Sequence, residues 1–431
     1  MTRNQKFKLG AKVLVATAEA KTLICHRGSL LKAFRSRGLE ITAVAADEDE
    51  RASSYLEQLG GRYEPVRMSR SGLNPFRDLL TFFDLWRICR RVKPDYYFGY
   101  TIKAVIYGVL AARLAGVKRV DVLIPGLGYG FTPDGTFKQW FVERVISFLY
   151  WLVLSRANRV YLQNHDDEEL LRRRGILSEK TPSSVTLGSG VALGDYKFDG
   201  LAGNRRLIEG RLKFVLVSRL LRAKGIGEYV EAARLVKRSH PDWEFDLVGP
   251  MDPGPDGVGA GEVEGWVNEG GINYRGETSD VKSFLRGAHV FVLPTYYREG
   301  VPKSTLEALS LGRPVVTTDA VGARETVKLT GEGWRQRGAG EAVMEGWNGF
   351  LVEPRNGGAL ADAIERIGAS AERVVMFGVE ARKLAEERFD VRRVNGMLMR
   401  GMGLVGEGVG EGVWSGSEVE GGVERERMRT A

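Results

Sequence analysis

The chain has 431 residues, of which 43% are hydrophobic, and a formal net charge of +8 at pH 7. This length exceeds the size at which a single hydrophobic core usually stops growing, so we expect two domains rather than one. Cys25 and Cys89 are the only two cysteines, which excludes a disulfide framework or a cysteine-ligated metal cluster and favours a reducing compartment.

The N-terminal segment MTRNQKFKLGAKVLVATAEA is basic but contains only a short apolar run, from Val13 to Ala16. That run is too short for the core of a signal peptide, so we expect the chain to stay in the cytoplasm. Basic residues outnumber acidic ones in residues 1–200 but not in residues 201–431. The first half is therefore expected to face an acidic partner.

The first half of the chain alternates apolar strands with helices. Strands are predicted at KVLVAT, LEITAVAA, PDYYFGY, RVDVLIP and NRVYLQN, with helices from Gly28 to Arg37 and from Ala104 to Leu114. Such alternation predicts a parallel sheet with right-handed crossovers. We therefore expect an α/β, Rossmann-like domain over residues 1–190.

Ligands of such sheets bind beyond the carboxyl ends of the strands, which directs attention to two loops. The loop TIKAVIYG carries Thr101 and Lys103, and the loop PGLGYGF carries Gly126, Gly128 and Tyr129. Glycines there would let backbone amides approach an anion closely, although a short GxGxG is also common in ordinary loops.

The loop after the first strand, TAEAKTLICHRGS, contains His26 and Arg27. Either one of these two residues contacts an acceptor substrate bound beyond the strand, or the segment is a plain surface loop. Asp47 and Asp49 form a literal DxD within the acidic run DEDE. Its place just after a strand favours a solvated helix start over a metal site, and we predict no metal site in this chain.

Basic and aromatic residues interleave in TFKQWFVERVISFLYWLVLSRANR. The basic ones are Lys138, Arg144, Arg156 and Arg159, and the aromatic ones include Trp140, Phe141, Phe148, Tyr150 and Trp151. The apolar run from Val145 to Leu154 is far shorter than the ~20 residues that span a bilayer. The segment is either an interfacial helix on an anionic membrane surface or a core helix of the N-terminal domain. No helix-turn-helix, zinc or RNA-binding signature is present, so nucleic acid is not an expected partner.

Residues 191–212 are rich in glycine and predict a linker, after which a second strand-helix alternation begins. Strands are predicted at KFVLVS, WEFDLVG, INYRG, HVFVLP, PVVTT and GFLVEP, and they define a second Rossmann-like domain over residues 213–375. MDPGPDGVGAGEVEG and residues 328–349 are predicted as loops. Residues 376–400 predict a helix, and the glycine-rich residues 401–431 predict disorder.

Two segments of the second domain carry candidate chemistry. Arg219 and Lys224 flank the loop after the strand KFVLVS, where two cations can meet a diphosphate. Downstream, EGVPKSTLE places Glu299 in a turn and Glu307 on the helix that follows Pro302. Free amides at that helix start, around Gly300, Val301 and Lys303, form an anion site between the two carboxylates.

With its flanking strands AHVFVLPT and RPVVTTD, this stretch resembles the E-x7-E signature of glycosyltransferase family 4, retaining enzymes of the two-domain GT-B fold. The resemblance implies that Glu299 contacts the donor sugar, that Glu307 contacts the ribose, and that Arg219 and Lys224 neutralise the leaving diphosphate of a UDP-sugar. It also implies that the helix at 376–400 returns towards the N-terminal domain. Neither a metal nor a cofactor is implied.

The loops at Thr101 and Gly126 are similar to those of a subset of this family that extends undecaprenyl-diphosphate-linked sugars, such as N-acetylgalactosaminyltransferases. The sequence departs from many members because TAEAKTLICHRGS lacks their glycine pair. The resemblance thus implies a UDP-sugar donor and a lipid-diphosphate-linked saccharide acceptor, at the cytoplasmic face of a membrane. A sugar-nucleotide epimerase of the same architecture and a non-catalytic membrane-surface protein are the alternatives.

Overall fold

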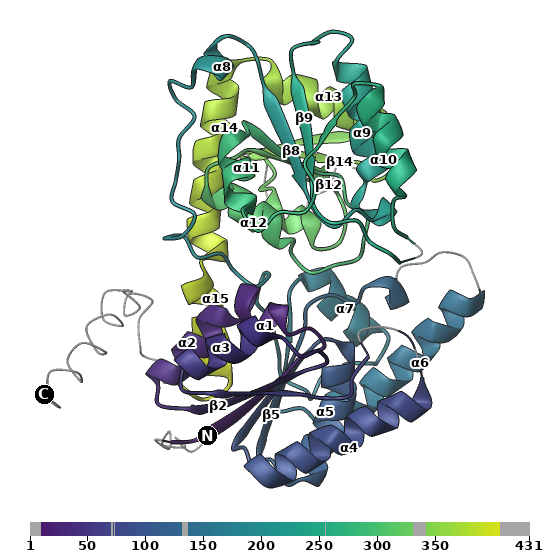
Figure 1. Ribbon diagram of the computed structural model, residues 1–431, viewed down its shortest axis with the longest axis vertical. Helices are drawn as coiled ribbons and strands as arrows, with labels where there is room; N and C mark the ends of the chain where they lie inside the picture. Colours follow the sequence, from purple (N-terminus) through teal and green to yellow (C-terminus); the bar gives the residue numbers. More distant parts are fainter. Residues whose placement is uncertain are drawn as a thin grey trace, which may run out of the picture. The chain divides into compact units, whose positions relative to one another are not determined.

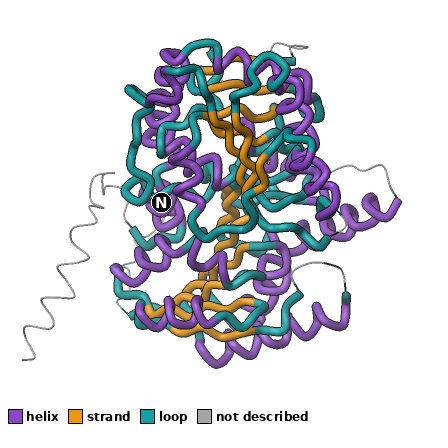
Figure 2. The backbone as a smooth tube through the Cα atoms, turned by 45° about the horizontal axis from the view of Figure 1, so that its top comes forward, coloured by secondary structure: helices purple, strands orange, loops and turns teal. Residues whose placement is uncertain are grey.

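The computed structural model describes residues 10–69, 72, 74–131, 137–254, 256–330 and 342–405. The chain divides into two compact units. Unit 1 comprises Met1–Pro125, Thr136–Ser189 and Val391–Ala431, and unit 2 comprises Gly126–Gly135 and Gly190–Asp390. Both units are α/β, and in each of them strands form an inner layer between helices (Figure 2).

Unit 1 contains a seven-stranded sheet in the order β3-β2-β1-β4-β5-β6-β7, with all pairings parallel. Its strands are β1 (Lys12–Ala16), β2 (Glu40–Ala45), β3 (Arg62–Pro65), β4 (Tyr96–Tyr100), β5 (Arg119–Ile124), β6 (Arg159–Leu162) and β7 (Ser183–Val185). Its helices are α1 (Lys21–Cys25), α2 (Gly28–Ser36), α3 (Glu50–Gln58), α4 (Pro75–Val92), α5 (Ile102–Leu114), α6 (Phe137–Leu154), α7 (His165–Arg173) and α15 (Val391–Gly401). Helices α1, α2, α3 and α15 cover one face of the sheet, and α4, α5 and α6 cover the other (Figure 1).

Unit 2 contains a second seven-stranded sheet, in the order β10-β9-β8-β11-β12-β14-β13. Its strands are β8 (Lys213–Val217), β9 (Glu244–Val248), β10 (Asn273–Tyr274), β11 (Val290–Leu293), β12 (Val315–Thr318), β13 (Val343–Gly346) and β14 (Gly349–Val352), and only β13 is antiparallel to its neighbour. Its helices are α8 (Arg205–Ile208), α9 (Ile226–Val236), α10 (Ala260–Asn268), α11 (Val281–Gly287), α12 (Lys303–Ser310), α13 (Gly357–Gly368) and α14 (Ala371–Leu384). Helices α9, α10 and α13 lie on one side of the sheet, and α11, α12 and α14 on the other (Figure 1).

The two Rossmann-like domains predicted from the sequence are confirmed, because apolar strand runs such as Val13 to Ala16 are buried on both faces, as a covered parallel sheet requires. Two predicted loops contain structure instead. Helix α10 begins at Ala260, anchored by the buried Val263, and β13 pairs with β14 within the segment predicted as an extended loop. Both segments are rich in glycine, which favoured a loop in the sequence.

The predicted linker at 191–212 is folded as part of unit 2. Leu201 and Leu207 are buried, and the buried guanidinium of Arg313 donates to the carbonyl of Asp199 at 2.5 Å. The second, longer segment of unit 2 therefore begins at Gly190 and ends at Asp390, later than the expected 375.

The C-terminal helix α15 belongs to unit 1. Val394, Leu398 and Met399 are buried in one cluster with residues of β1, α2 and β2. Met402 and Leu404 are also buried in that cluster, so the ordered chain extends past the expected start of the disordered tail at 401. The rest of that expected tail, from 406 onward, lies outside the described residues.

Candidate functional site

The loop after β8 brings a lysine and a glutamate together. A 3₁₀ turn, Arg222–Lys224, ends at Gly225, whose φ of 74° and approach to the carbonyl of Pro294 leave no room for a Cβ. This turn places the ammonium of the buried Lys224 in an ion pair with the partly buried carboxylate of Glu299. The two residues that the sequence motifs placed about 75 positions apart therefore meet in unit 2.

Thr295, two residues after the end of β11, completes this cluster. Its hydroxyl lies 3.3 Å from the Glu299 carboxylate and 3.3 Å from the carbonyl of Ala223. The Lys224 ammonium also lies 5.6 Å from the centre of the Tyr297 ring. The cluster combines a cation, a carboxylate and a ring in one partly enclosed place, which suits a sugar joined to an anion. Sequence reasoning did not single out Thr295 or Tyr297.

Arg219 lies in the same loop but in a different environment. Its guanidinium is about half exposed and forms an ion pair with Asp252 at 2.8 Å. Arg222, two residues before Lys224, is paired with Glu262 through both carboxylate oxygens, at 2.9 and 2.7 Å. Lys224 is thus the only one of the loop's three described cations that is buried.

Glycines hold the turn that carries Glu299. A Cβ on Gly322, whose φ is 80°, would lie 2.0 Å from the carbonyl oxygen of Gly300. A Cβ on Gly126 would lie 2.5 Å from the amide nitrogen of Gly300, and the Gly128 amide donates to the carbonyl of Arg298 at 2.9 Å. These contacts allow other backbone segments to approach the turn closely. Gly126 and Gly128, predicted to bind an acceptor, are thus part of unit 2 and support the Glu299 turn.

Tyr129 begins a 3₁₀ turn, Tyr129–Phe131, that continues the same segment. Helix α12 begins at Lys303, directly after its N-cap residue Pro302. Val301 is buried beside it. The turn from Gly300 therefore leads directly into the positive end of a helix dipole, where an anion is stabilised.

Glu307 lies on α12 and is buried. Burial raises the pKa of its carboxyl, and the Lys303 ammonium, 3.7 Å away, opposes that shift. The hydroxyl of Tyr196 hydrogen-bonds to the same carboxylate. Tyr196 lies in the segment predicted as a linker, so sequence reasoning missed it. A polar residue set of this kind along α12 fits the recognition of hydroxyl groups.

In unit 1, the residues predicted to bind an acceptor follow the carboxyl ends of β1 and β4. Thr101 has a φ of 78°, which is uncommon for a threonine, and its hydroxyl accepts a hydrogen bond from the amide of Ala18 at 3.0 Å. This hydrogen bond joins the loop after β1, which contains Ala18, to the loop after β4, which contains Thr101. Strain of this kind clusters at functional sites.

Lys103 makes a structural contact. Its ammonium lies 2.6 Å from the Asp78 carboxylate, and both side chains are buried. The lysine predicted to bind an acceptor is thus paired with helix α4, because a buried cation needs a carboxylate partner.

His26 and Arg27 do not form a plain surface loop. The His26 Nδ1 lies 2.9 Å from the Cys25 Sγ, which is exposed, while Arg27 is buried. Burial lowers the pKa of the Arg27 guanidinium to about 10, and its carbon lies 5.4 Å from the centre of the Tyr100 ring at the end of β4. Among the described residues its Nε and Nη1 have no hydrogen-bond partner.

The DEDE run starts a helix, as predicted. The Asp49 carboxylate caps α3 by accepting from the Ala52 amide at 2.9 Å, and Asp47 accepts from the Ala20 amide at 3.0 Å. Within the described ranges, no three His, Cys, Asp or Glu side chains gather as a metal ligand set.

Helix α6 was expected to be either a core helix or an interfacial helix, and it has one buried face and one exposed aromatic face. Tyr150 and Leu154 are buried, whereas Trp140, Phe141 and Trp151 are about half exposed. None of the helices in the described part of the chain is both long and apolar enough to cross a bilayer. The side chain of Lys138 lies outside the description.

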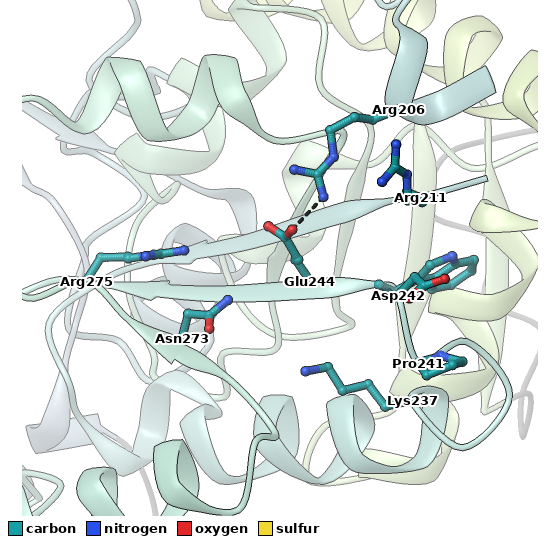
Figure 3. A pocket seen from close by; sticks show the side chains of 9 residues that line it. Arg206, Arg211, Lys237, Pro241, Asp242, Glu244, Asn273 and Arg275 are labelled. Carbon is teal, nitrogen blue, oxygen red and sulfur yellow. Dashed lines mark hydrogen bonds and ion pairs between the residues drawn. The ribbon is translucent and has the colours of Figure 1, made fainter. Parts of the chain in front are cut away.

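A separate pocket of about 470 Å³ lies in unit 2 (Figure 3). Its lining residues are Arg206, Arg211, Lys237, Pro241, Asp242, Trp243, Glu244, Asn273 and Arg275. Glu244 and Asn273 begin β9 and β10, so the pocket opens at the amino ends of the strands, the sheet edge opposite to Thr295 and Lys224. Ligands of such sheets bind at the other edge, which separates this pocket from the candidate site.

Two family models match the chain and together cover well over half of it. Residues 211–369 match the model described as glycosyl transferases group 1, and residues 26–181 match a glycosyl transferase 4-like domain. The first match contains the Lys224–Glu299 cluster, and the second contains most of unit 1.

Two curated relatives are similar over most of the chain. The N,N'-diacetylbacillosaminyl-diphospho-undecaprenol alpha-1,3-N-acetylgalactosaminyltransferase of Campylobacter jejuni is 28% identical over 71% of this chain and 80% of its own length. The UDP-Gal:alpha-D-GlcNAc-diphosphoundecaprenol alpha-1,3-galactosyltransferase of Escherichia coli is 24% identical over 68% of this chain and 70% of its own length.

Solved structures show the same fold. Anabaena HepE in complex with UDP and glucose superposes with a TM-score of 0.70 at 18% identity, covering 92% of this chain and 100% of that one. Sucrose-phosphate synthase from Thermosynechococcus elongatus gives a TM-score of 0.67 at 17% identity, covering 90% and 98%. The fold is GT-B.

Proposed function

Because this chain belongs to the group 1 glycosyltransferases, with a family 4-like N-terminal domain, we propose that it moves a hexose or N-acetylhexosamine from a UDP-sugar to a lipid-diphosphate-linked saccharide. The transfer retains the anomeric configuration and uses no metal. The observation that carries the proposal is the ion pair of the buried Lys224 with Glu299, at the turn that leads into α12.

The donor's diphosphate lies at the start of α12 in this proposal. The amides around Val301 to Lys303 and the helix dipole stabilise its charge, and Lys224 and Arg219 add cations from the loop after β8. The charge that develops on the leaving diphosphate as its bond to the sugar breaks is then met by fixed groups. Lys224 is the principal cation because it is already desolvated, so its interaction is less screened than that of the exposed Arg219.

The two glutamates bind different parts of the donor. Glu299 is held by Lys224 and Thr295, so it orients the sugar and supports the positive charge of an oxocarbenium-like centre. Glu307, with Tyr196, binds the ribose hydroxyls. One helical turn and the preceding turn separate the two carboxylates, which suits a ligand with a diphosphate between its sugars.

The acceptor is proposed to bind unit 1, near the joined loops at Ala18 and Thr101. The names of the two curated relatives support a diphospho-undecaprenol-linked saccharide as its class. The exposed aromatic face of α6, with Arg144, supports peripheral attachment to an anionic membrane, at its cytoplasmic face.

The decisive test is a panel of UDP- and GDP-sugars, scored by UDP or GDP release with and without undecaprenyl-diphosphate-linked saccharides. Release that depends on one UDP-sugar and one lipid acceptor, that persists in EDTA and that gives a product with the donor's anomeric configuration by NMR is the expected result. Lys224→Ala should abolish most of it, while Arg222→Ala, in the same loop but paired with Glu262, should keep it. Equal activity of these two variants would remove Lys224 from the donor site.

A further inference from the structure

Helix α4 in unit 1 carries an exposed apolar stripe. Phe76 is 84% exposed, Leu79 53%, and Leu80 and Phe83 about 40%. Their spacing of three, four and seven residues places them on one face of the helix. The opposite face is buried, and its residues Asp78, Thr81, Leu85, Ile88 and Cys89 pack inward. A surface helix that only closes a core would present polar residues outward, so the outer stripe of α4 needs another explanation.

Helix α6 has the same two-faced construction. Its exposed residues Phe137, Trp140, Phe141, Phe148 and Trp151 follow one helical stripe, and its buried residues Ile146, Tyr150, Val153 and Leu154 follow the opposite one. Both helices pack against α5 in the layer that covers one face of the unit 1 sheet (Figure 1).

These stripes concentrate the exposed apolar surface of the described chain. Of its eighteen strongly exposed large apolar side chains, ten lie on α4, α5 and α6. Single exposed apolar residues are normal, but a concentration of this kind on three helices of one layer marks an interaction surface.

Cations surround the stripe on α4. Arg77, Arg87 and Arg90 are exposed on that helix, and the Arg90 guanidinium lies 5.9 Å from the centre of the Trp86 ring. On α6, the Arg144 guanidinium lies 5.5 Å from the centre of the Trp140 ring. Arginine and tryptophan side by side suit the headgroup region of a bilayer, where one end of each side chain is wet.

The acidic side chains of the two helices are all neutralised by partners within unit 1. Asp78 is paired with the buried Lys103, and Asp84 is paired with Arg67 at 2.6 Å. Glu143, on α6, is paired with Arg174. The outward face of both helices is therefore apolar and positive.

We infer that the outer faces of α4 and α6 together dock unit 1 onto an anionic bilayer surface, with α4 as a second interfacial helix beside α6. The inference rests on the proposed function for its lipid-linked acceptor and extends it to a second helix. Apolar stripes of this kind enter the interfacial region, while the arginines at their margins meet anionic headgroups. A second copy of the same face is a poorer partner, because its arginines would oppose those of the first.

The test compares three triple variants by co-sedimentation with vesicles of phosphatidylcholine, with and without phosphatidylglycerol. Phe76→Gln, Leu80→Gln and Phe83→Gln remove the α4 stripe, and Trp140→Gln, Phe141→Gln and Trp151→Gln remove the α6 stripe. The matched control, Val267→Gln, Trp347→Gln and Met376→Gln, changes three exposed apolar residues of unit 2.

We expect the α4 and α6 variants each to lose at least tenfold in partitioning to anionic vesicles, and the control to bind like the wild type. Binding of the wild type should also fall with added salt, because salt screens the arginines. Release of UDP from the donor in detergent should be unchanged in all three variants. An α4 variant that partitions like the control overturns the inference, even if the α6 variant is released.

A second overturning result is a wild-type dimer that the α4 variant loses without any change in vesicle binding, because the stripe would then be a contact between copies. The proposed function fails separately, if no nucleotide sugar is turned over with any lipid acceptor while vesicle binding still depends on α4.

Discussion

Replacing Gly322 by alanine should move the turn that carries Glu299 without touching any polar group. Two costs follow from the structure. The φ of 80° and ψ of −46° at Gly322 lie in a backbone region that strains alanine, at a cost of about 1–3 kcal/mol. In addition, the new Cβ would lie 2.0 Å from the carbonyl oxygen of Gly300, so the turn must retreat, at an overpacking cost of about 1–3 kcal/mol. A retreat of roughly 1 Å at a reacting centre lowers turnover about 100-fold.

Gly270 provides the matched control. Its φ is 72°, and a Cβ there would meet no atom within 4 Å. Gly270→Ala therefore carries the cost of a positive φ without any overpacking, and should lose less unfolding free energy than Gly322→Ala while keeping its turnover number. Urea unfolding separates the two costs, and UDP release with saturating donor and acceptor measures the displacement of Glu299. If both variants keep the same turnover number, the Gly322 contact does not position the catalytic turn.

Three further predictions follow from buried charges. Lys224→Ala should lower kcat/KM for the donor by about 10- to 100-fold, the equivalent of one charge-assisted contact of roughly 1.5–3 kcal/mol. Arg219→Ala should lower it by less, because Arg219 is half exposed. Equal losses in steady-state kinetics would contradict this order. Burial raises the pKa of Glu307 above 4.5, so between these two values the folded chain holds a proton that the unfolded chain has lost. The unfolding free energy should therefore fall as pH rises from 4.5 through the raised pKa. Glu307→Gln should flatten this part of the pH dependence measured by urea unfolding, and an unchanged slope would exclude Glu307 as its cause. Lys103→Met should lower the unfolding free energy by about 3–5 kcal/mol, because it leaves Asp78 buried without its cation. Adding Asp78→Leu should restore most of that stability. No recovery in the double variant would mean that the lysine has another role.

The sheets were predictable because their strands are continuous apolar runs, a pattern that hardly depends on distant residues. The Glu299 and Lys224 motifs were predictable for a similar reason, since each lies at the end of such a run. Their ion pair was not predictable from spacing, because it depends on how the loops after β8 and β11 fold over one another. The contacts of Gly126 were likewise not predictable from its position in the sequence. Its sequence position assigns it to the end of β5, but its contacts are with the Glu299 turn.

Helix α4 was missed for a different reason. Its apolar residues follow two opposite stripes rather than one, so the pattern lacks the polar face by which an amphipathic helix is found. The signal that was available is Asn74 before Pro75, a helix start that the structure uses: the Asn74 side chain accepts from the Arg77 amide. Tyr196 carried no signal, because its hydroxyl reaches Glu307 only after the predicted linker folds onto α12.

Helix α15 sets the order in which the protein can be completed during synthesis. Its buried residues share one core cluster with Val13, Leu31 and Phe34, so these residues must wait until a helix that is made after the whole of residues 190–390 has left the ribosome. At typical translation rates the residues of unit 2 alone add roughly 10–40 s to that wait. During this time the surface that α15 will cover is open to water and to other chains. Removal of residues from 391 onward should therefore give a chain that aggregates while it is being made, even though unit 2 is intact.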